Sequence, residues 1–404
     1  MRKFCAGGGQ SPLTLDLHGN NQQVAMLNVS AVGPTGSTVT VKDSTNTGAT
    51  LTMTGTGPGT SSPGTVAAYA NIASGGTLNL LTNFTDSSAN DGVAIFNGTT
   101  VNLASGVTFS APLDLLLAPN SSNGTVNLNG GTLASNAITA GGGVATVNLD
   151  GTLAMTGNSP VTGSTWITPG ITLNVLSQGV TLNVASGVQG VVDSPFLQGP
   201  NSSSGGVTVA GGGTVTMSGV NTYTGATTVE SGTLALGGGS SPATIADSSL
   251  LTIQSGGTFD ISAITASATT LKGMTISGGT INVAMNGSGN VSNIVLNAAA
   301  TVSGSNIINF AAASGVTALT PGTYNLLADA GGGLTGTFLF GNGATSEKYL
   351  LGSDNYMLTL TNSSTLETLN VGAGAPVPEP ATLGLFAIGG LVLALIGRKR
   401  KARV

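Results

Sequence analysis

The sequence predicts an all-β protein, a right-handed parallel β-helix followed by a C-terminal transmembrane helix. Three observations lead to this prediction. The 404 residues include 64 glycines and only 4% aromatic residues. Short segments with strand-like alternation recur about every 20–26 residues, a step typical of solenoids. No 3.6-residue apolar period appears before the C-terminal segment, and Gly, Thr, Ser, Asn and Val are poor helix formers.

The predicted strands follow a repeated unit, Gly-Thr-Leu or Gly-Thr-Val and then a small or polar residue and another aliphatic one. It stands at residues 76–80, 124–128, 151–155 and 232–236. Every second side chain is apolar over about five residues, which is the pattern of a half-buried strand.

Equivalent aliphatic positions give the period of the repeat. The steps are 23, 25, 21 and 26 residues along Leu78, Val101, Val126, Val147 and Leu173, and the repeat continues with steps of 25 and 22 along Leu234, Phe259 and Ile281. We expect these side chains to stack inward, with Thr, Ser and Asn outward and Gly at the corners. A two-sheet sandwich array is the alternative, which this short step and the shortage of large core residues disfavour.

One copy of the repeat, residues 211–237, is more complete than the others. We expect its inward stack to be Val215, Met217, Val229, Leu234 and Leu236, and residues 221–225 to form a corner. This copy resembles the autotransporter-associated β-strand repeat, which occurs in exported proteins. The positions that match are Gly219, Asn221, Thr222, Tyr223, Thr224, Gly225, Thr227, Val229, Gly232 and Leu234.

The pattern divides the chain into five parts. We assign residues 1–306 to the solenoid, 307–371 to closing rungs and a cap, 372–380 to a linker, 381–397 to a transmembrane helix and 398–404 to a basic cytoplasmic tail. Within the closing part, strand patterning is clear at residues 322–327 and 356–360.

The C-terminus combines three ordered elements: Val377-Pro378-Glu379-Pro380, an apolar stretch, and the basic residues Arg398, Lys399 and Arg400. As a helix the apolar stretch is about 24 Å long, close to the minimum for a hydrocarbon core about 30 Å thick. The basic end is expected on the cytoplasmic side, which places the body across the membrane.

This order resembles the PEP-CTERM sorting signal. The resemblance implies export, recognition by an exosortase-type membrane protease, and release to the surface or the extracellular matrix. A plain tail anchor is the alternative, although it needs no Pro-Glu-Pro.

The N-terminus lacks the apolar run of a secretory signal after Arg2 and Lys3, because Leu13, Leu15 and Leu17 alternate as in a strand. Our interpretation is that Met1 lies within the mature protein and that the true start is upstream. Cys5 is the single cysteine, so no internal disulfide is expected.

The charge distribution argues against nucleic acid as a partner. Between Phe4 and Gly397 there is no Arg, and the basic residues are Lys42, Lys272 and Lys348, in a chain of net charge −5. Binding to phosphate backbones depends on Lys and Arg. Low charge with a mean hydropathy of +0.33 also separates this chain from disordered ones.

Residues for catalysis are scarce, so we predict that the chain is not an enzyme and holds no metal or cofactor. His18 is the only histidine, which points to a surface residue rather than a Ser-His-Asp group. Asp86 and Asp91 flank a short loop and could share calcium, but solvated loop carboxylates are the simpler interpretation. The remaining carboxylates are isolated at turns: Asp150, Asp193, Asp247 and Asp260. The glycine runs lack the Lys of a phosphate-binding loop and are expected to form corners: Gly141–Gly143, Gly211–Gly213 and Gly237–Gly239.

Two non-enzymatic functions remain. The first is a structural or adhesive protein of the cell surface or matrix, whose Thr and Asn rows contact extracellular polysaccharide or other copies of the chain. The second is an ice- or glycan-binding surface, suggested by Thr-x-Thr at residues 38–40 and 52–54. A regular Thr array across four or more adjacent rungs would favour the second. A cluster of three or more carboxylates would instead favour a polysaccharide-degrading enzyme.

Overall fold

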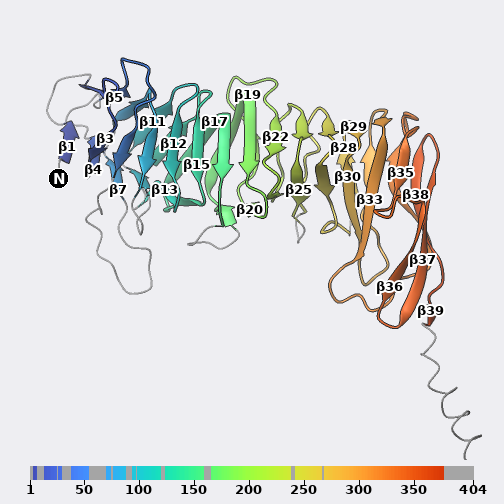
Figure 1. Ribbon diagram of the computed structural model, residues 1–404. Helices are drawn as coiled ribbons and strands as arrows, with labels where there is room; N and C mark the ends of the chain where they lie inside the picture. The colour runs from blue at the N-terminus through green and yellow to red at the C-terminus, as the bar shows by residue number, and fades with distance from the viewer. Residues whose placement is uncertain are drawn as a thin grey trace, which may run out of the picture.

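The computed structural model describes residues 3–6, 13–24, 26–29, 38–53, 70–73, 76–87, 93–96, 98–119, 123–158, 165–237, 242–265 and 268–376. In these residues the secondary structure is strand without helix, and the strands stack side by side along one axis (Figure 1). The predicted all-β solenoid is therefore confirmed. Within the same residues, no helix has the length and apolarity needed to cross a bilayer. The predicted transmembrane helix at 381–397 lies outside the described residues.

Each turn of the solenoid, here called a rung, passes through up to three strand positions, which we call faces A, B and C. Strands on one face pair in parallel with those of the rungs before and after. Face A contains β2 (Leu13–Asp16), β5 (Thr38–Lys42), β8 (Thr77–Leu80), β11 (Thr99–Leu103), β14 (Asn123–Asn127), the first half of β17 (Val144–Met155), the first half of β19 (Ile171–Val184) and β21 (Phe196–Gln198).

Face B contains more strands than face A. The strands β17 and β19 each continue from face A around the corner onto face B. At this corner the pairing register between β17 and β19 shifts between Leu149 and Gly151. The face contains β3 (Gln22–Val24), β6 (Leu51–Met53), β9 (Phe84–Asp86), β12 (Thr108–Ala111), β15 (Thr132–Ser135), the second halves of β17 and β19, β22 (Val207–Ala210), β24 (Thr227–Val229), β26 (Leu251–Ile253), β29 (Met274–Ser277) and β32 (Thr301–Ser303).

Face C forms a separate sheet. It contains β7 (Ala70–Ala73), β10 (Val93–Phe96), β13 (Leu115–Leu117), β16 (Ile138–Ala140), β18 (Thr165–Ile167), β20 (Gln189–Val192), β23 (Thr214–Met217), β25 (Gly232–Leu236), β27 (Gly257–Asp260), β30 (Thr280–Met285), β33 (Ser305–Ala312) and β35 (Thr337–Leu339). At the N-terminal end, β1 (Lys3–Ala6) and β4 (Met26–Val29) form a further parallel pair.

The register confirms the predicted equivalences. Leu78 pairs with Val101, Val101 with Val126, and Val126 with Val147, which pairs in turn with Leu173. Leu234, Phe259 and Ile281 also align with one another, but they lie on face C and therefore do not continue the series on face A. All of these side chains are fully buried, so alternation along each strand and stacking between rungs build one continuous core.

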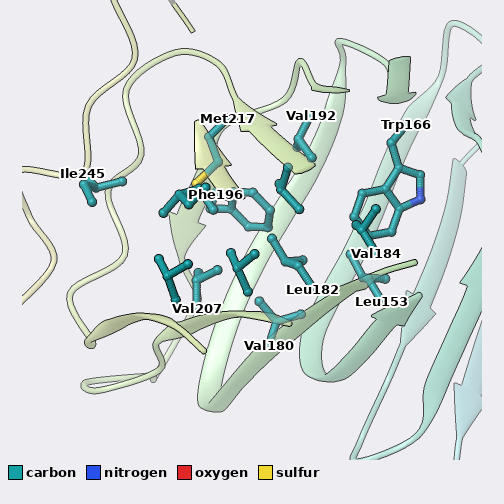
Figure 2. Packing of buried hydrophobic residues seen from close by; sticks show 14 of the residues in the cluster. Leu153, Trp166, Val180, Leu182, Val184, Val192, Phe196, Val207, Met217 and Ile245 are labelled. Atoms are coloured by element: carbon teal, nitrogen blue, oxygen red, sulfur yellow. The ribbon is translucent and has the colours of Figure 1, made fainter. Parts of the chain in front are cut away.

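The core is made largely of aliphatic side chains (Figure 2). Burial of each Leu or Val side chain stabilises the fold by about 1.5–3 kcal/mol. The larger residues are accommodated by specific contacts: Trp166 donates its Nε1–H to the carbonyl oxygen of Ser135 at 2.8 Å, and the rings of Phe84 and Phe109 meet edge to face, with centroids 5.2 Å apart.

The C-terminal end of the stack changes strand direction. β28 (Thr269–Leu271), β31 (Ile294–Leu296) and β34 (Gly322–Asp329) are parallel, but β38 (Leu366–Val371), β37 (Asp354–Asn362) and β36 (Ser346–Leu351) continue the sheet as antiparallel strands, with the short β39 (Ala375–Pro376) beside β37. The antiparallel strands β36 and β37, orange in Figure 1, extend beyond the rungs. We call β34 and β36–β38 the cap.

One polar side chain in the cap stands out. Glu367 of β38 is fully buried, and neither of its carboxyl oxygens has a hydrogen-bond partner among the described residues. Burial without compensation disfavours the charged carboxylate and raises the pKa of Glu367 to about 7.

Candidate binding surface

A straight row of threonines runs along face B, one per rung and in register throughout. Each of these side chains is half-buried, except the last, which is exposed. Neighbouring strands in a sheet lie about 4.8 Å apart, so the hydroxyl and methyl groups repeat at that spacing. The members of this threonine row are Thr108, Thr132, Thr152, Thr181, Thr208, Thr228, Thr252, Thr275 and Thr301.

The row follows from the strand pattern. Next to each of the first eight threonines stands a fully or almost fully buried aromatic or aliphatic residue, such as Leu133, Leu182 or Ile253. Because successive side chains alternate between the two sides of a strand, an inward residue at one position sets its neighbour outward. Threonine is β-branched and suits this half-buried position, so the row is compatible with stable strands.

The middle of the threonine row borders a shallow groove of about 380 Å³. Four members of the row line it, and residues without a side chain or with a methyl group, including Gly179, Gly206 and Ala226, form the adjoining corner. Asp150 is the charged residue of the lining; its carboxylate accepts hydrogen bonds from the backbone N–H and the side-chain amide of Gln178 at 2.8 and 3.3 Å. The groove is therefore polar and carries no cationic side chain.

Face A carries an asparagine ladder. Each side-chain amide donates to the side-chain oxygen of the previous rung at 2.6–2.9 Å, and all four bonds run in the same direction. A second row of five aligned threonines runs beside the ladder, two residues before each asparagine. The ladder consists of Asn79, Asn102, Asn127, Asn148 and Asn174.

Replacing the central asparagine of the ladder tests its contribution. Asn127→Ala removes one donor and one acceptor, so the half-buried Asn102 oxygen loses the amide that donates to it and the Asn148 amide loses its acceptor. We expect the free energy of unfolding to fall by about 1–2 kcal/mol, measured by urea denaturation followed by circular dichroism. Asn183→Ala, at an exposed position of β19, is the control; an equal loss there would contradict a specific role for the ladder.

The predicted corner at residues 221–225 is built around two buried side chains. Asn221 bridges adjacent rungs, because its oxygen accepts the N–H of Phe196 at 2.8 Å and its amide donates to the carbonyl of Thr244 at 3.0 Å. The Tyr223 hydroxyl lies 2.6 Å from Thr227 Oγ1, and burial raises the Tyr223 pKa. The predicted inward stack is confirmed, since Val215, Met217, Val229, Leu234 and Leu236 are all buried.

His18 is exposed, as predicted, and lies in a turn that two carboxylates stabilise. Its Nδ1 is 3.1 Å from Ser44 Oγ. Asp16 accepts the backbone N–H groups of Ser44 and His18, and these bonds, that from Ser44 first, lower the Asp16 pKa to about 2. The carboxylate thus binds the backbone and does not orient the imidazole, so the arrangement is a turn rather than a catalytic triad.

The other carboxylates singled out from the sequence are not brought together. Asp150, Asp193 and Asp260 each accept a hydrogen bond from the following rung, at different levels of the stack. Asp86, expected to be a solvated loop carboxylate, is instead buried, and Asp91 lies outside the described residues. Over the part of the chain that the structure describes, no three His, Cys, Asp or Glu residues form a group that could hold a metal.

The sorting residues predicted at the C-terminus, Val377–Pro380 and Arg398–Arg400, lie outside the described residues. In sequence, however, a family model described as the PEP-CTERM protein-sorting motif matches residues 376–401. The chain carries a PEP-CTERM sorting motif. This finding confirms the resemblance, and the PEP-CTERM motif implies processing by an exosortase-type system.

A second family model, the passenger-associated transport repeat, matches residues 207–236. The match confirms the repeat predicted at 211–237. It covers β22 to β25, which include one segment of the threonine row and the Asn221 corner. Together with the PEP-CTERM motif, the repeat implies export of this β-solenoid to the cell surface.

Among solved structures, the chain is similar to the Hap adhesin of Haemophilus influenzae, with 13% identity and a TM-score of 0.24. The alignment covers 89% of this chain and 49% of the adhesin chain, so this chain spans about half the length of that protein. No curated protein matches the chain. A likeness this distant carries no argument about function.

The threonine row is the main feature that the sequence prediction missed. The Thr-x-Thr segments considered there do not form it: Thr40 of face A aligns with Thr14 and Asn79, and Thr52 aligns with Thr85. The available signal was a threonine beside a buried residue once per period, as in Gly-Thr-Leu at 131–133 and 151–153. Alignment of these threonines with one another required the register between rungs.

Proposed function

We propose that this chain is a structural and adhesive protein of the cell surface or extracellular matrix, without enzymatic activity. The observation that carries the proposal is a long solenoid with outward rows of hydroxyl and amide groups, joined to a PEP-CTERM motif. Such rows offer many weak, repeated contacts, whose combined strength grows with their number. Polysaccharide and other copies of the chain are the partners that these contacts suit.

In this proposal the C-terminal segment is a sorting signal. The apolar stretch at 381–397 inserts in the membrane, Arg398, Lys399 and Arg400 stay on the cytoplasmic side, and an exosortase-type protease processes the chain near Pro378, Glu379 and Pro380. A plain tail anchor would give the same insertion without processing.

Replacing Pro378, Glu379 and Pro380 together with alanine tests whether this segment is a sorting signal. We expect the variant to remain in the membrane fraction at its full mass, whereas the unaltered chain appears in the envelope or the medium with its C-terminal segment removed. Intact-mass analysis of the protein from each fraction of its native cells measures both. An unaltered chain that keeps its basic tail in the membrane would instead support a plain anchor.

An ice- or glycan-binding surface is a second candidate function. It is favoured by a specific observation, the threonine row of nine successive aligned residues on face B. Regular hydroxyl and methyl groups at about 4.8 Å can match a ligand that itself repeats. The first candidate uses the outward rows of faces A and B for adhesion, whereas the second uses the threonine row of face B to bind one repeating ligand.

A further inference from the structure

We infer that the groove beside the threonine row binds a neutral, extended glycan chain lying along the axis of the solenoid. The inference rests on the proposed function and makes it specific. The site consists of Thr152, Thr181, Thr208 and Thr228 with the adjoining corner residues.

The repeat of the site points to a linear polymer. Thr152 pairs with Thr181, Thr181 with Thr208, and Thr208 with Thr228, so four hydroxyl groups lie in a line parallel to the axis. A ligand that lies along this line meets the same donor and acceptor in every rung. A sugar chain has hydroxyl groups on every unit and an apolar ring surface that can contact the threonine methyl groups.

The shape of the site distinguishes a chain from a flat crystal plane. The corner beside the row is hollowed, and small residues line it: Gly151, Gly179, Gly206 and Ala226. At the three glycines the backbones of neighbouring rungs approach so closely that a Cβ would overlap a carbonyl oxygen. A concave site surrounds a chain more completely than it does a plane. The hollow therefore favours a polymer that can enter it, whereas an ice lattice would contact the threonine row alone.

The charge of the site selects a neutral ligand. The lining includes the carboxylate of Asp150 and no cationic side chain. An acidic polysaccharide would place like charges close together in the groove, which costs free energy. Asp150 and Gln178, held together by two hydrogen bonds, instead offer polar groups to sugar hydroxyls.

The experiment compares two sets of three threonine-to-valine substitutions in the full chain. Thr152→Val, Thr181→Val and Thr208→Val remove hydroxyls from the groove and retain the branched shape that suits a strand. Thr214→Val, Thr233→Val and Thr258→Val, aligned with one another on face C, are the matched control. Binding of cellohexaose, maltohexaose, mannohexaose and oligogalacturonate is measured by calorimetry.

We expect at least one neutral hexasaccharide to bind to the unaltered chain. The face B variant should bind it about tenfold more weakly, a loss of about 1.4 kcal/mol in binding free energy. The face C variant should bind it with unchanged affinity. Ala226→Leu, which fills the hollow while the threonine row stays intact, should weaken binding as well.

Four outcomes would overturn the inference: no neutral hexasaccharide binds; the two variants lose affinity equally; oligogalacturonate binds as tightly as the neutral probes; or the unaltered chain binds no glycan but shapes ice crystals through the same threonines. Delivery of the chain to the cell surface is measured separately by cell fractionation. Failure of the glycan site therefore remains distinguishable from failure of the proposed surface function.

Discussion

Gly232→Ala is expected to lower the free energy of unfolding by about 3 kcal/mol or more. Gly232 has a φ of +74°, in the left-handed region that costs an L-residue about 1–2 kcal/mol. An added Cβ would also overlap the carbonyl oxygen of Gly213 in the preceding rung, and its other near neighbours are backbone atoms of Gly212. Backbone atoms in a stacked rung cannot move aside at low cost, so both penalties apply. Urea unfolding followed by circular dichroism measures the change.

Gly256→Ala is the matched control, since it lies in the next rung. Gly256 has a φ of +90°, but an added Cβ meets no atom within 4 Å. This variant should lose only the conformational part, about 1–2 kcal/mol. Equal losses at both positions would show that the close approach of rungs at Gly232 contributes nothing.

Raising the pH from about 4 to about 8 is expected to destabilise the cap by on the order of 2–3 kcal/mol through Glu367. Its carboxyl group is neutral in the fold at low pH, since burial raises its pKa from 4.5 to about 7. The unfolded chain ionises near 4.5, so the stabilisation is complete below that pH and is lost as the pH rises through about 7. Unfolding free energies at a series of pH values measure the slope.

Glu367→Gln provides the comparison, because glutamine is similar in shape and does not ionise. The variant should show no slope between about pH 4.5 and 7 from this position. Hydrogen bonds lower the pKa of Asp16, led by the Ser44 N–H, and of Asp43, led by the Thr45 hydroxyl. Their contribution is lost only as the pH falls below about 4, outside this window. The same slope in the glutamine variant would assign the effect to another group.

The core of the solenoid was predictable because it depends on local pattern. Each strand alternates apolar and polar residues, and the spacing from Leu78 to Val101 to Val126 repeats closely enough to align successive rungs. The structure confirms those alignments, together with the inward side chains of the repeat around Val229 and Leu234.

The outward rows were harder to predict because they depend on register between rungs separated by loops of unequal length. The asparagines of the ladder are recognisable one at a time, but only the pairing of strands shows that Asn127 bonds to both Asn102 and Asn148. The groove has the same origin, since residues from separate rungs, such as Asp150 and Thr208, meet along it.

The direction of the strands in the cap could not be predicted from the sequence pattern either. Alternation at residues 356–360 predicts a strand, and β37 occupies residues 354–362, yet the same alternation suits parallel and antiparallel pairing. Glu367 gave no signal either, because an acidic residue in a strand is ordinarily expected at the surface. Its burial reflects the tertiary arrangement of β38, which lies between β34 and β37.

The asparagine ladder stays unbroken although its members are separated by 21 residues at one step and 26 at another. The strands therefore fix the alignment, and the connecting loops absorb the difference in length. Loop closure depends only weakly on loop length, so added residues at such a corner cost little. Insertions at the corners can accumulate over generations without disturbing the stack, and new surface properties can arise there while the scaffold is inherited unchanged.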